Sequence, residues 1–190
     1  MTINGPGAGL LTVSGQNSVR VFQIDAGVTA EIDGIAVANG RAPDGSPGAN
    51  AVTTPTAGSG GTGGDGGGIL NLGTLTLKQD SIVNNVAGNG GSGGTGAQGV
   101  TGTRPVLGPP GGTGGMGGQG GDGGAIYSSN SLTLVQDTLL GNHAGAGGFG
   151  GRAGPGPPAE ISIPGHQAAT VDRAGPAEPE AQSIPRAHSR

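Results

Sequence analysis

Short runs in which aliphatic and polar residues alternate recur along the chain. Residues 74–77 (Thr-Leu-Thr-Leu) and 131–134 (Ser-Leu-Thr-Leu) place leucine at every second position, so in an extended strand both leucines lie on one face. The same alternation occurs at residues 11–13, 22–24, 30–32 and 35–37, and each run is bounded by Gly, Asn or Asp. No window has the 3.6-residue period of a helix. The pattern therefore predicts many short, half-buried strands and almost no helix.

Two of these runs belong to an internal repeat. Residues 65–87 and 122–144 are copies of one another at an offset of 57 residues, with 11 of the 23 aligned pairs identical. A repeated pattern of very short strands is typical of a solenoid, in which equivalent residues stack on one another from coil to coil.

The predicted fold class is therefore all-β, a right-handed parallel β-helix (solenoid) of about three coils with long Gly-rich loop insertions. Each copy supplies short strands near residues 68–70, 75–77 and 82–83, and stacked parallel strands lie about 4.8 Å apart. The predicted interior ladder pairs Ile69 with Ile126, Leu75 with Leu132, Leu77 with Leu134 and Ile82 with Leu139.

An asparagine follows the third strand of each copy. Asn85 and Asn142 are expected at the same turn of neighbouring coils, where their amides can bond to each other and to the turn backbone. We expect a structural role for both, and Asn39 is expected at the same turn of a more divergent N-terminal coil.

Glycine separates the strand-forming regions. Insertions at about residues 40–64 and 88–121 must leave the solenoid and return to it, and they contain runs with a strict Gly-Gly-x period. Three residues per turn is the period of a polyproline-II-type helix, but the same runs are typical of flexible glycine linkers, the interpretation that the sequence favours. Residues 1–151 are thus assigned to the solenoid with its insertions. Residues 152–190 form a Pro-rich tail that we expect to be disordered or loosely attached.

Composition adds mainly exclusions. Gly and Pro make up 61 of 190 residues, and the formal net charge is only -4. Only Phe22, Tyr127 and Phe149 are aromatic and the cationic residues are scattered, which argues against nucleic-acid binding. There is no cysteine, no export signal and no run of 18 apolar residues.

Stacked acidic residues are the candidate metal ligands. Asp65 over Asp122 and Asp80 over Asp137 would repel one another unless a cation lies between them, and calcium is the natural candidate. Residues 60–68 and 117–125 also resemble the calcium-binding nonapeptide Gly-Gly-x-Gly-x-Asp-x-U-x, with glycine where the apolar residue U belongs. The alternative, which the sequence favours, is that these aspartates are solvated turn residues.

No catalytic constellation is found, so we predict that the protein is not an enzyme and has no catalytic residues. Lys78 aligns with Val135 and His143 with Val86, while His166 and His188 lie in the Pro-rich tail. None of these has acid/base spacing, and each is interpreted as a surface residue.

The two copies resemble the repeats of the pectin-lyase-like superfamily, particularly those of polymorphic outer-membrane proteins and autotransporter adhesins. The marks of those repeats, Gly-Gly-Ala-Ile and Phe-x-x-Asn, correspond to residues 123–126 with 139–142, and to residues 66–69 with 82–85. An aliphatic residue replaces the aromatic residue in both copies. The Gly-Gly-x insertions resemble the glycine-rich PE_PGRS surface proteins of mycobacteria.

This resemblance implies a non-enzymatic protein of the bacterial cell surface, outer membrane or extracellular space, similar to an adhesin or passenger, which binds host or environmental glycans or proteins. Two alternatives stay open: a fragment of a carbohydrate-active β-helix enzyme of the polysaccharide lyase or hydrolase kind, and a purely structural stalk or spacer. Because about three coils with exposed ends are a minimum for a solenoid, we also expect the chain to be part of a longer protein.

Overall fold

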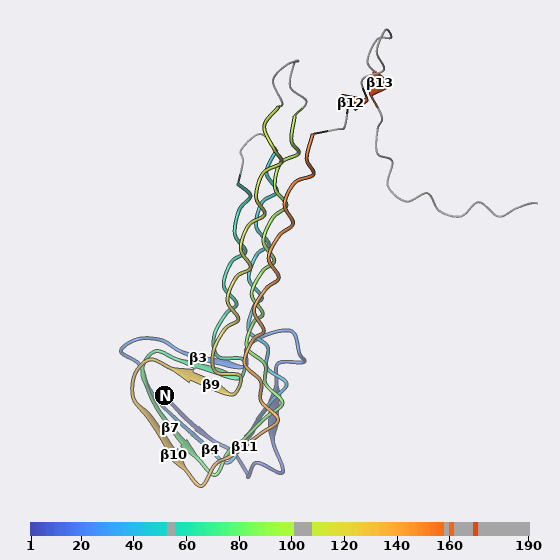
Figure 1. The fold of residues 1–190 in the computed structure, drawn as a ribbon. Coiled ribbons are helices and arrows are strands. Elements are labelled where there is room, and N and C mark those ends of the chain that lie inside the picture. Colours follow the sequence, from blue (N-terminus) through green and yellow to red (C-terminus); the bar gives the residue numbers. More distant parts are fainter. Residues whose placement is uncertain (53–55, 101–107, 158–159, 162–168, 171–190) are drawn as a thin grey trace, which may run out of the picture.

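The computed structural model of the chain describes residues 1–52, 56–100, 108–157, 160–161 and 169–170. Its base is a stack of parallel strands, and from the base a long arm of extended segments projects (Figure 1). The described residues contain no α-helix, and thus no helix long and apolar enough to cross a membrane.

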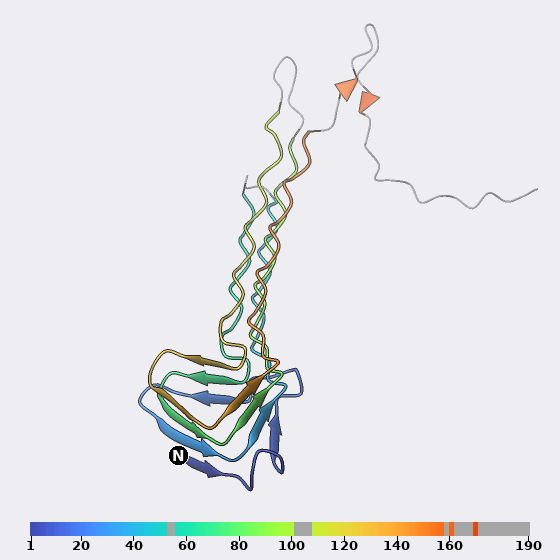
Figure 2. The same ribbon diagram turned by 60° about the horizontal axis from the view of Figure 1, so that its bottom comes forward.

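Three parallel sheets form the base, and successive strands along the chain go to different sheets (Figure 2). The first sheet has the order β1 (Thr2–Asn4), β4 (Thr29–Asp33), β7 (Thr74–Lys78) and β10 (Leu132–Val135). The second has the order β2 (Thr12–Ser14), β5 (Ala36–Ala38), β8 (Ser81–Val83) and β11 (Thr138–Leu140). The third has the order β3 (Phe22–Ile24), β6 (Ile69–Asn71) and β9 (Ile126–Ser128). This arrangement confirms an all-β fold of stacked parallel strands.

The strand register confirms the predicted ladder. Ile69 lies beside Ile126, Leu75 beside Leu132, Leu77 beside Leu134, and Ile82 beside Leu139. The ladder continues toward the N-terminus, where Leu77 pairs with Ile32 and Ile82 with Val37. These aliphatic side chains face the interior because alternate residues of each short strand point inward.

The core is nearly all aliphatic. Its fully buried members are Ile24, Ala30, Ile32, Ile35, Val37, Ile69, Leu75, Leu77 and Ile82. The last strands of the stack are more open, because Leu134 and Leu139 are 45% and 46% exposed although their partners Leu77 and Ile82 are fully buried.

Polar residues fix the corner between the second and third sheets. Asn85 Oδ1 accepts the Gly40 N–H at 2.7 Å, and Asn142 Oδ1 accepts the Asn85 N–H at 2.9 Å. Asn85 is fully buried, so its structural role is confirmed. Asn39 lies at the same corner, as predicted, and it is aligned with Asn84, because Gly40 takes the place beside Asn85. Asn39 also shares a left-handed conformation with Asn84, at φ 51° and 54°.

Near the C-terminal end, β12 (Glu160–Ile161) pairs antiparallel with β13 (Ala169–Thr170). The predicted tail begins at residue 152, but residues 152–157 continue the arm. Most of the tail, with His166 and His188, lies outside the described residues.

Candidate functional site

The arm contains five extended segments that run alternately away from the base and back to it (Figure 1). We number them in chain order: I (42–52), II (56–66), III (87–100), IV (108–122) and V (144–157). Segments I, III and V run outward and form the outgoing set, while II and IV form the returning set. The predicted insertions thus leave the base and return to it.

Backbone hydrogen bonds join the segments at every third residue. Between parallel segments III and V, the Gly90, Gly93 and Gly96 N–H groups donate to Ala146, Phe149 and Arg152 carbonyls, each at 2.8 Å. Between antiparallel segments IV and III, the Gly115 N–H donates to the Gly94 carbonyl and the Gly118 N–H to the Gly91 carbonyl, both at 2.8 Å. A three-residue spacing is that of a polyproline-II helix, which cannot form hydrogen bonds within itself and must bond to neighbours.

Glycine is required where two segments meet. A Cβ atom at Gly91 of segment III would overlap the Ser46 carbonyl of segment I, and one at Gly118 of segment IV would overlap the Gly61 carbonyl of segment II. The Gly-Gly-x runs therefore form an ordered bundle, whereas the sequence favoured flexible linkers. In segments III and IV, two residues of each triplet supply the close approach, and the side chain of the third is left free of it.

The third residues make two exposed surfaces. The outgoing surface carries three rows: Asp44, Pro47 and Asn50; Asn89, Ser92, Thr95 and Gln98; Ala146, Phe149, Arg152 and Pro155. The returning surface carries two rows: Thr56, Ser59, Thr62 and Asp65; Thr113, Met116, Gln119 and Asp122. Most of these side chains are exposed, with Phe149 at 86% and Met116 at 75%. Hydroxyl and amide side chains make up five of the eleven residues on the outgoing surface and five of the eight on the returning surface, and each surface carries two charged residues.

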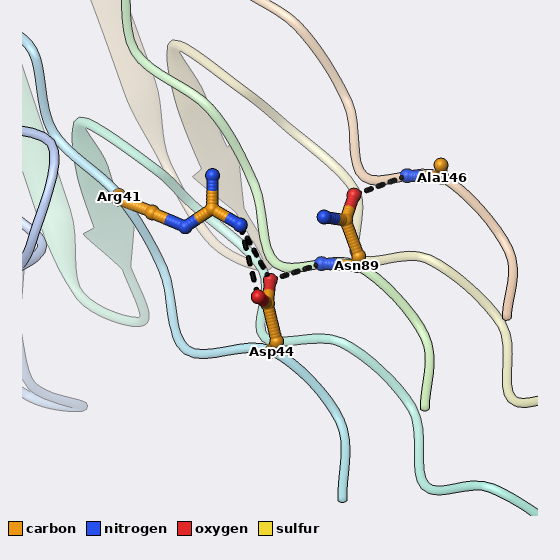
Figure 3. A network of polar contacts seen from close by, with 4 residues as sticks. All are labelled: Arg41, Asp44, Asn89 and Ala146. Carbon is orange, nitrogen blue, oxygen red and sulfur yellow. Dashed lines mark hydrogen bonds and ion pairs between the residues drawn. The ribbon is translucent and has the colours of Figure 1, made fainter. Parts of the chain in front are cut away.

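On the outgoing surface, side chains tie one row to the next (Figure 3). Asp44 Oδ1 accepts the Asn89 N–H at 2.7 Å, and Asn89 Oδ1 accepts the Ala146 N–H at 2.9 Å. Asp44 also pairs with Arg41, whose Nη2 lies 2.9 Å from Oδ2. The hydrogen bonds from Asn89 and then Arg41 lower the pKa of Asp44. This chain of contacts orders the part of the arm nearest the base.

Arg20 fastens the base to the arm. Its Nε donates to the Gly66 carbonyl at 2.9 Å and its Nη2 to the Asp65 carbonyl at 2.8 Å. Burial lowers the pKa of Arg20, and the nearby charge of Asp65 opposes this shift. The bidentate contact fixes the point at which segment II re-enters the solenoid.

Asp65 and Asp122 lie next to each other at the base of the returning surface. Asp65 Oδ1 accepts the Asp122 N–H at 2.8 Å, so this carboxylate bonds to backbone in the adjacent segment. Calcium binding at the pair stays a prediction.

Asp80 and Asp137 stack at a second corner. Asp137 Oδ1 accepts the Asp80 N–H at 2.8 Å, and Asp80 Oδ1 accepts the Ile35 N–H at 2.8 Å. Asp80 is only 2% exposed. Burial is the largest effect on the pKa of Asp80 and raises it. The backbone hydrogen bonds from Ile35 and Lys78 act in the opposite direction and lower the pKa. The negative charges of Asp137 and Asp33 raise it again, so the pKa is raised overall. Each carboxylate thus caps a backbone N–H of its neighbour, and calcium binding here also stays a prediction.

The structure does not gather the other titratable residues. Lys78 Nζ pairs with Glu31 Oε2 at 2.9 Å on one surface of the first sheet, and His143 is exposed beside the arm. Within the described ranges, no group of three or more His, Cys, Asp or Glu is arranged to hold a metal ion.

Sequence reasoning missed the two arm surfaces. The signal was present in the strict Gly-Gly-x period, which leaves one position in three for side chains that point outward. The pairing of distant insertions, however, depends on the coils that hold their ends together.

Comparisons with known proteins assign no family to the chain. No family model matches it, and no curated protein matches it. The springtail antifreeze protein from Granisotoma rainieri, described as a nine polyproline type II helical bundle, aligns over 80% of this chain and 93% of its own. Identity is 20% and the TM-score is 0.14, which does not establish a shared fold.

Proposed function

We propose that the protein is a non-enzymatic binding scaffold of the bacterial cell surface or extracellular space, comparable to an adhesin or passenger domain. Within this proposal the base is a right-handed parallel β-helix of about three coils, of the pectin-lyase-like kind, and the glycine-rich arm is comparable to PE_PGRS proteins. The stacked parallel sheets in register support the β-helix part of the proposal.

One observation supports the binding role above all. The arm is held together mainly by backbone groups and glycines, so most side chains of the third residues on the outgoing surface, Phe149 among them, are not needed to hold it together. The row of segment III carries amides and hydroxyls, and the neighbouring row of segment V carries an exposed aromatic ring, Phe149; this combination suits a glycan or a polar protein surface.

The experiment is binding of the full chain to arrays of glycans and extracellular proteins. We expect at least one class of ligand to bind, and Phe149→Ser to weaken that binding about tenfold. Met116→Ser on the returning surface is the matched control, because that side chain is also exposed and apolar. Equal loss in both variants, or no ligand in any array, contradicts the proposal.

A stalk or spacer is the second candidate, because the described segments of the arm are extended and lead away from the base (Figure 2). This candidate predicts that the arm surfaces bind no ligand. It also predicts that shortening segments I to V together changes only the distance to which the arm extends from the base.

A further inference from the structure

Segment IV shows how one strand is bound inside the arm. Its Thr113, Met116 and Gln119 carbonyls accept hydrogen bonds from the parallel segment II, at N–H groups of residues 57, 60 and 63. Its glycine N–H groups at residues 112, 115 and 118 donate to the antiparallel segment III. A returning strand is therefore held by one row of donors and one row of acceptors.

The same two rows recur 57 residues later, at the outer side of segments IV and V. We call this the IV/V edge: the N–H groups of Gly114, Gly117 and Gly120, and the carbonyl groups of Gly145, Gly148 and Gly151. The donors correspond to residues 57, 60 and 63, and the acceptors to residues 88, 91 and 94. Among the residues that the structure describes, none of these six groups has a hydrogen-bond partner.

Space beside the edge is also open. A Cβ atom at Gly90 or Gly93 of segment III would overlap carbonyl oxygens of segment IV. At the equivalent Gly147 and Gly150 of segment V, the nearest atoms to such a Cβ lie 3.7 and 3.9 Å away. The edge thus has the hydrogen-bonding groups and the clearance of a strand-binding site.

We propose that the IV/V edge binds one extended, polyproline-II-type strand of another protein chain, with glycine at every third position. The pattern follows from segment IV, where a Cβ at Gly115 or Gly118 would overlap carbonyls of segment II. A guest strand at the IV/V edge would meet the equivalent carbonyls of segment IV. The guest residue that corresponds to Gly115 or Gly118 must therefore be glycine. This glycine also supplies the N–H group for segment V.

The other two positions of the guest triplet are free. In segment IV, the Met116 N–H and Gly117 N–H have no partner among the described residues. Proline is therefore tolerated at both positions, and it holds the free guest in the extended conformation before binding.

A second copy of the chain does not fit this role. In segment III, glycines at residues 88, 91 and 94 allow contact with segment I, because a Cβ at any of them would overlap a carbonyl of that segment. Segment I carries Pro43, Ser46 and Ala49 at the equivalent positions. The side chains of Pro43, Ser46 and Ala49 therefore prevent segment V of another molecule from packing against the outer side of segment I.

The repeat does not continue in this chain either. One further step of 57 residues from segment IV falls on residues 165–179, which contain only two glycines, Gly165 and Gly175. The guest strand is therefore assigned to a different protein. This assignment does not depend on the proposed function of the outgoing surface.

The test uses the full chain and a fluorescein-labelled (Gly-Ser-Pro)4 peptide, followed by fluorescence anisotropy. We expect saturable binding, and about tenfold weaker binding of (Ala-Ser-Pro)4. Gly147→Ala/Gly150→Ala should also weaken binding of the glycine peptide about tenfold, because the added methyl groups would overlap carbonyls of the guest strand. The same methyl groups point to open space in the free arm, so the variant should fold like the parent. Phe149→Ser is the control, since that side chain lies on the outgoing surface.

Amide hydrogen exchange supplies a second readout. The Gly117 and Gly120 N–H groups should become protected in the complex, while circular dichroism shows the double variant folded like the parent. Equal binding of both peptides, or unchanged binding by the double variant, overturns the proposal. Absence of binding at millimolar peptide overturns it too, as does a dimer of the parent chain that the double variant abolishes.

Discussion

Asn142 Oδ1 accepts two hydrogen bonds from Asn85, one from the backbone N–H and one from Nδ2, each at 2.9 Å. The Asn85 oxygen in turn accepts the N–H of Gly40, and its Nδ2 also donates to the Val37 carbonyl. One amide side chain therefore ties three successive levels of the stack together at the point where the arm begins.

Asn85→Ala should destabilise the protein by about 1–3 kcal/mol, because the buried Gly40 N–H loses its acceptor. Urea unfolding followed by circular dichroism measures the change. Asn130→Ala is the control, since that exposed side chain bonds only to the next residue's N–H and should cost little. Similar losses in both variants would argue against a special role for the Asn85 corner.

Asp80 should make the folded state less stable as the pH rises. Its pKa is raised in the folded chain, so the folded state binds the proton more tightly than the unfolded state. From about pH 4 upward through the raised pKa, the contribution of Asp80 to the free energy of unfolding falls. Melting temperatures of the parent and Asp80→Asn should therefore diverge as the pH rises above about 4, with the parent losing stability relative to the variant.

Asp44→Asn is the matched control for that pH series. The pKa of Asp44 is lowered in the folded chain, so its contribution is present above its ordinary pKa and is lost as the pH falls. The parent should thus gain stability relative to Asp44→Asn on going from pH 2 to 5. Parallel curves for the parent and Asp80→Asn would contradict the assignment of a raised pKa to Asp80.

Leu77 and Leu134 are partners in one ladder but should differ in their contribution to stability. Leu77→Ala should cost about 2–5 kcal/mol because the side chain is fully buried and a cavity remains. Leu134→Ala should cost about 1 kcal/mol, since that side chain is 45% exposed. Chemical denaturation of both variants tests this, and equal costs would mean that the last coil is covered in solution.

The arm should respond to glycine substitution according to position. Gly118→Ala forces a methyl group against the Gly61 carbonyl and should destabilise the arm by about 1–3 kcal/mol, while Gly150→Ala should change little. Amide exchange of the glycines in segments II and III reports on the arm separately from the base. Equal protection in both variants would mean that the close packing at Gly118 is absent.

The base was largely predictable from the sequence. The alternation at residues 74–77 and 131–134 fixes which side chains face inward, and the 57-residue repeat fixes which residues stack. The N-terminal coil was harder, because its offset of 45 residues, as between Ile32 and Leu77, has no comparable sequence identity. The sequence therefore placed Asn39 at the correct corner without showing that Gly40 is the residue beside Asn85.

The arm was less predictable. A Gly-Gly-x run has the same local sequence whether it is a free linker or part of a bundle, because each polyproline-II segment lacks internal hydrogen bonds. Order comes from neighbours that the solenoid brings together from distant parts of the chain, such as segments III and V. The aspartate stacks were correctly paired, but their use as caps of backbone N–H groups depends on turn geometry that spacing alone does not give.

The division of labour within each Gly-Gly-x triplet separates what holds the arm together from what it displays. Backbone groups and glycines carry the contacts between segments, and most third residues add a backbone carbonyl to these contacts while their side chains point to the exterior. Most side chains at these outward positions can therefore be substituted with little loss of stability. A side chain at a glycine between two segments would instead overlap the backbone of the neighbouring segment and destabilise the arm. Such an arm can vary its exterior rapidly while its framework stays constant.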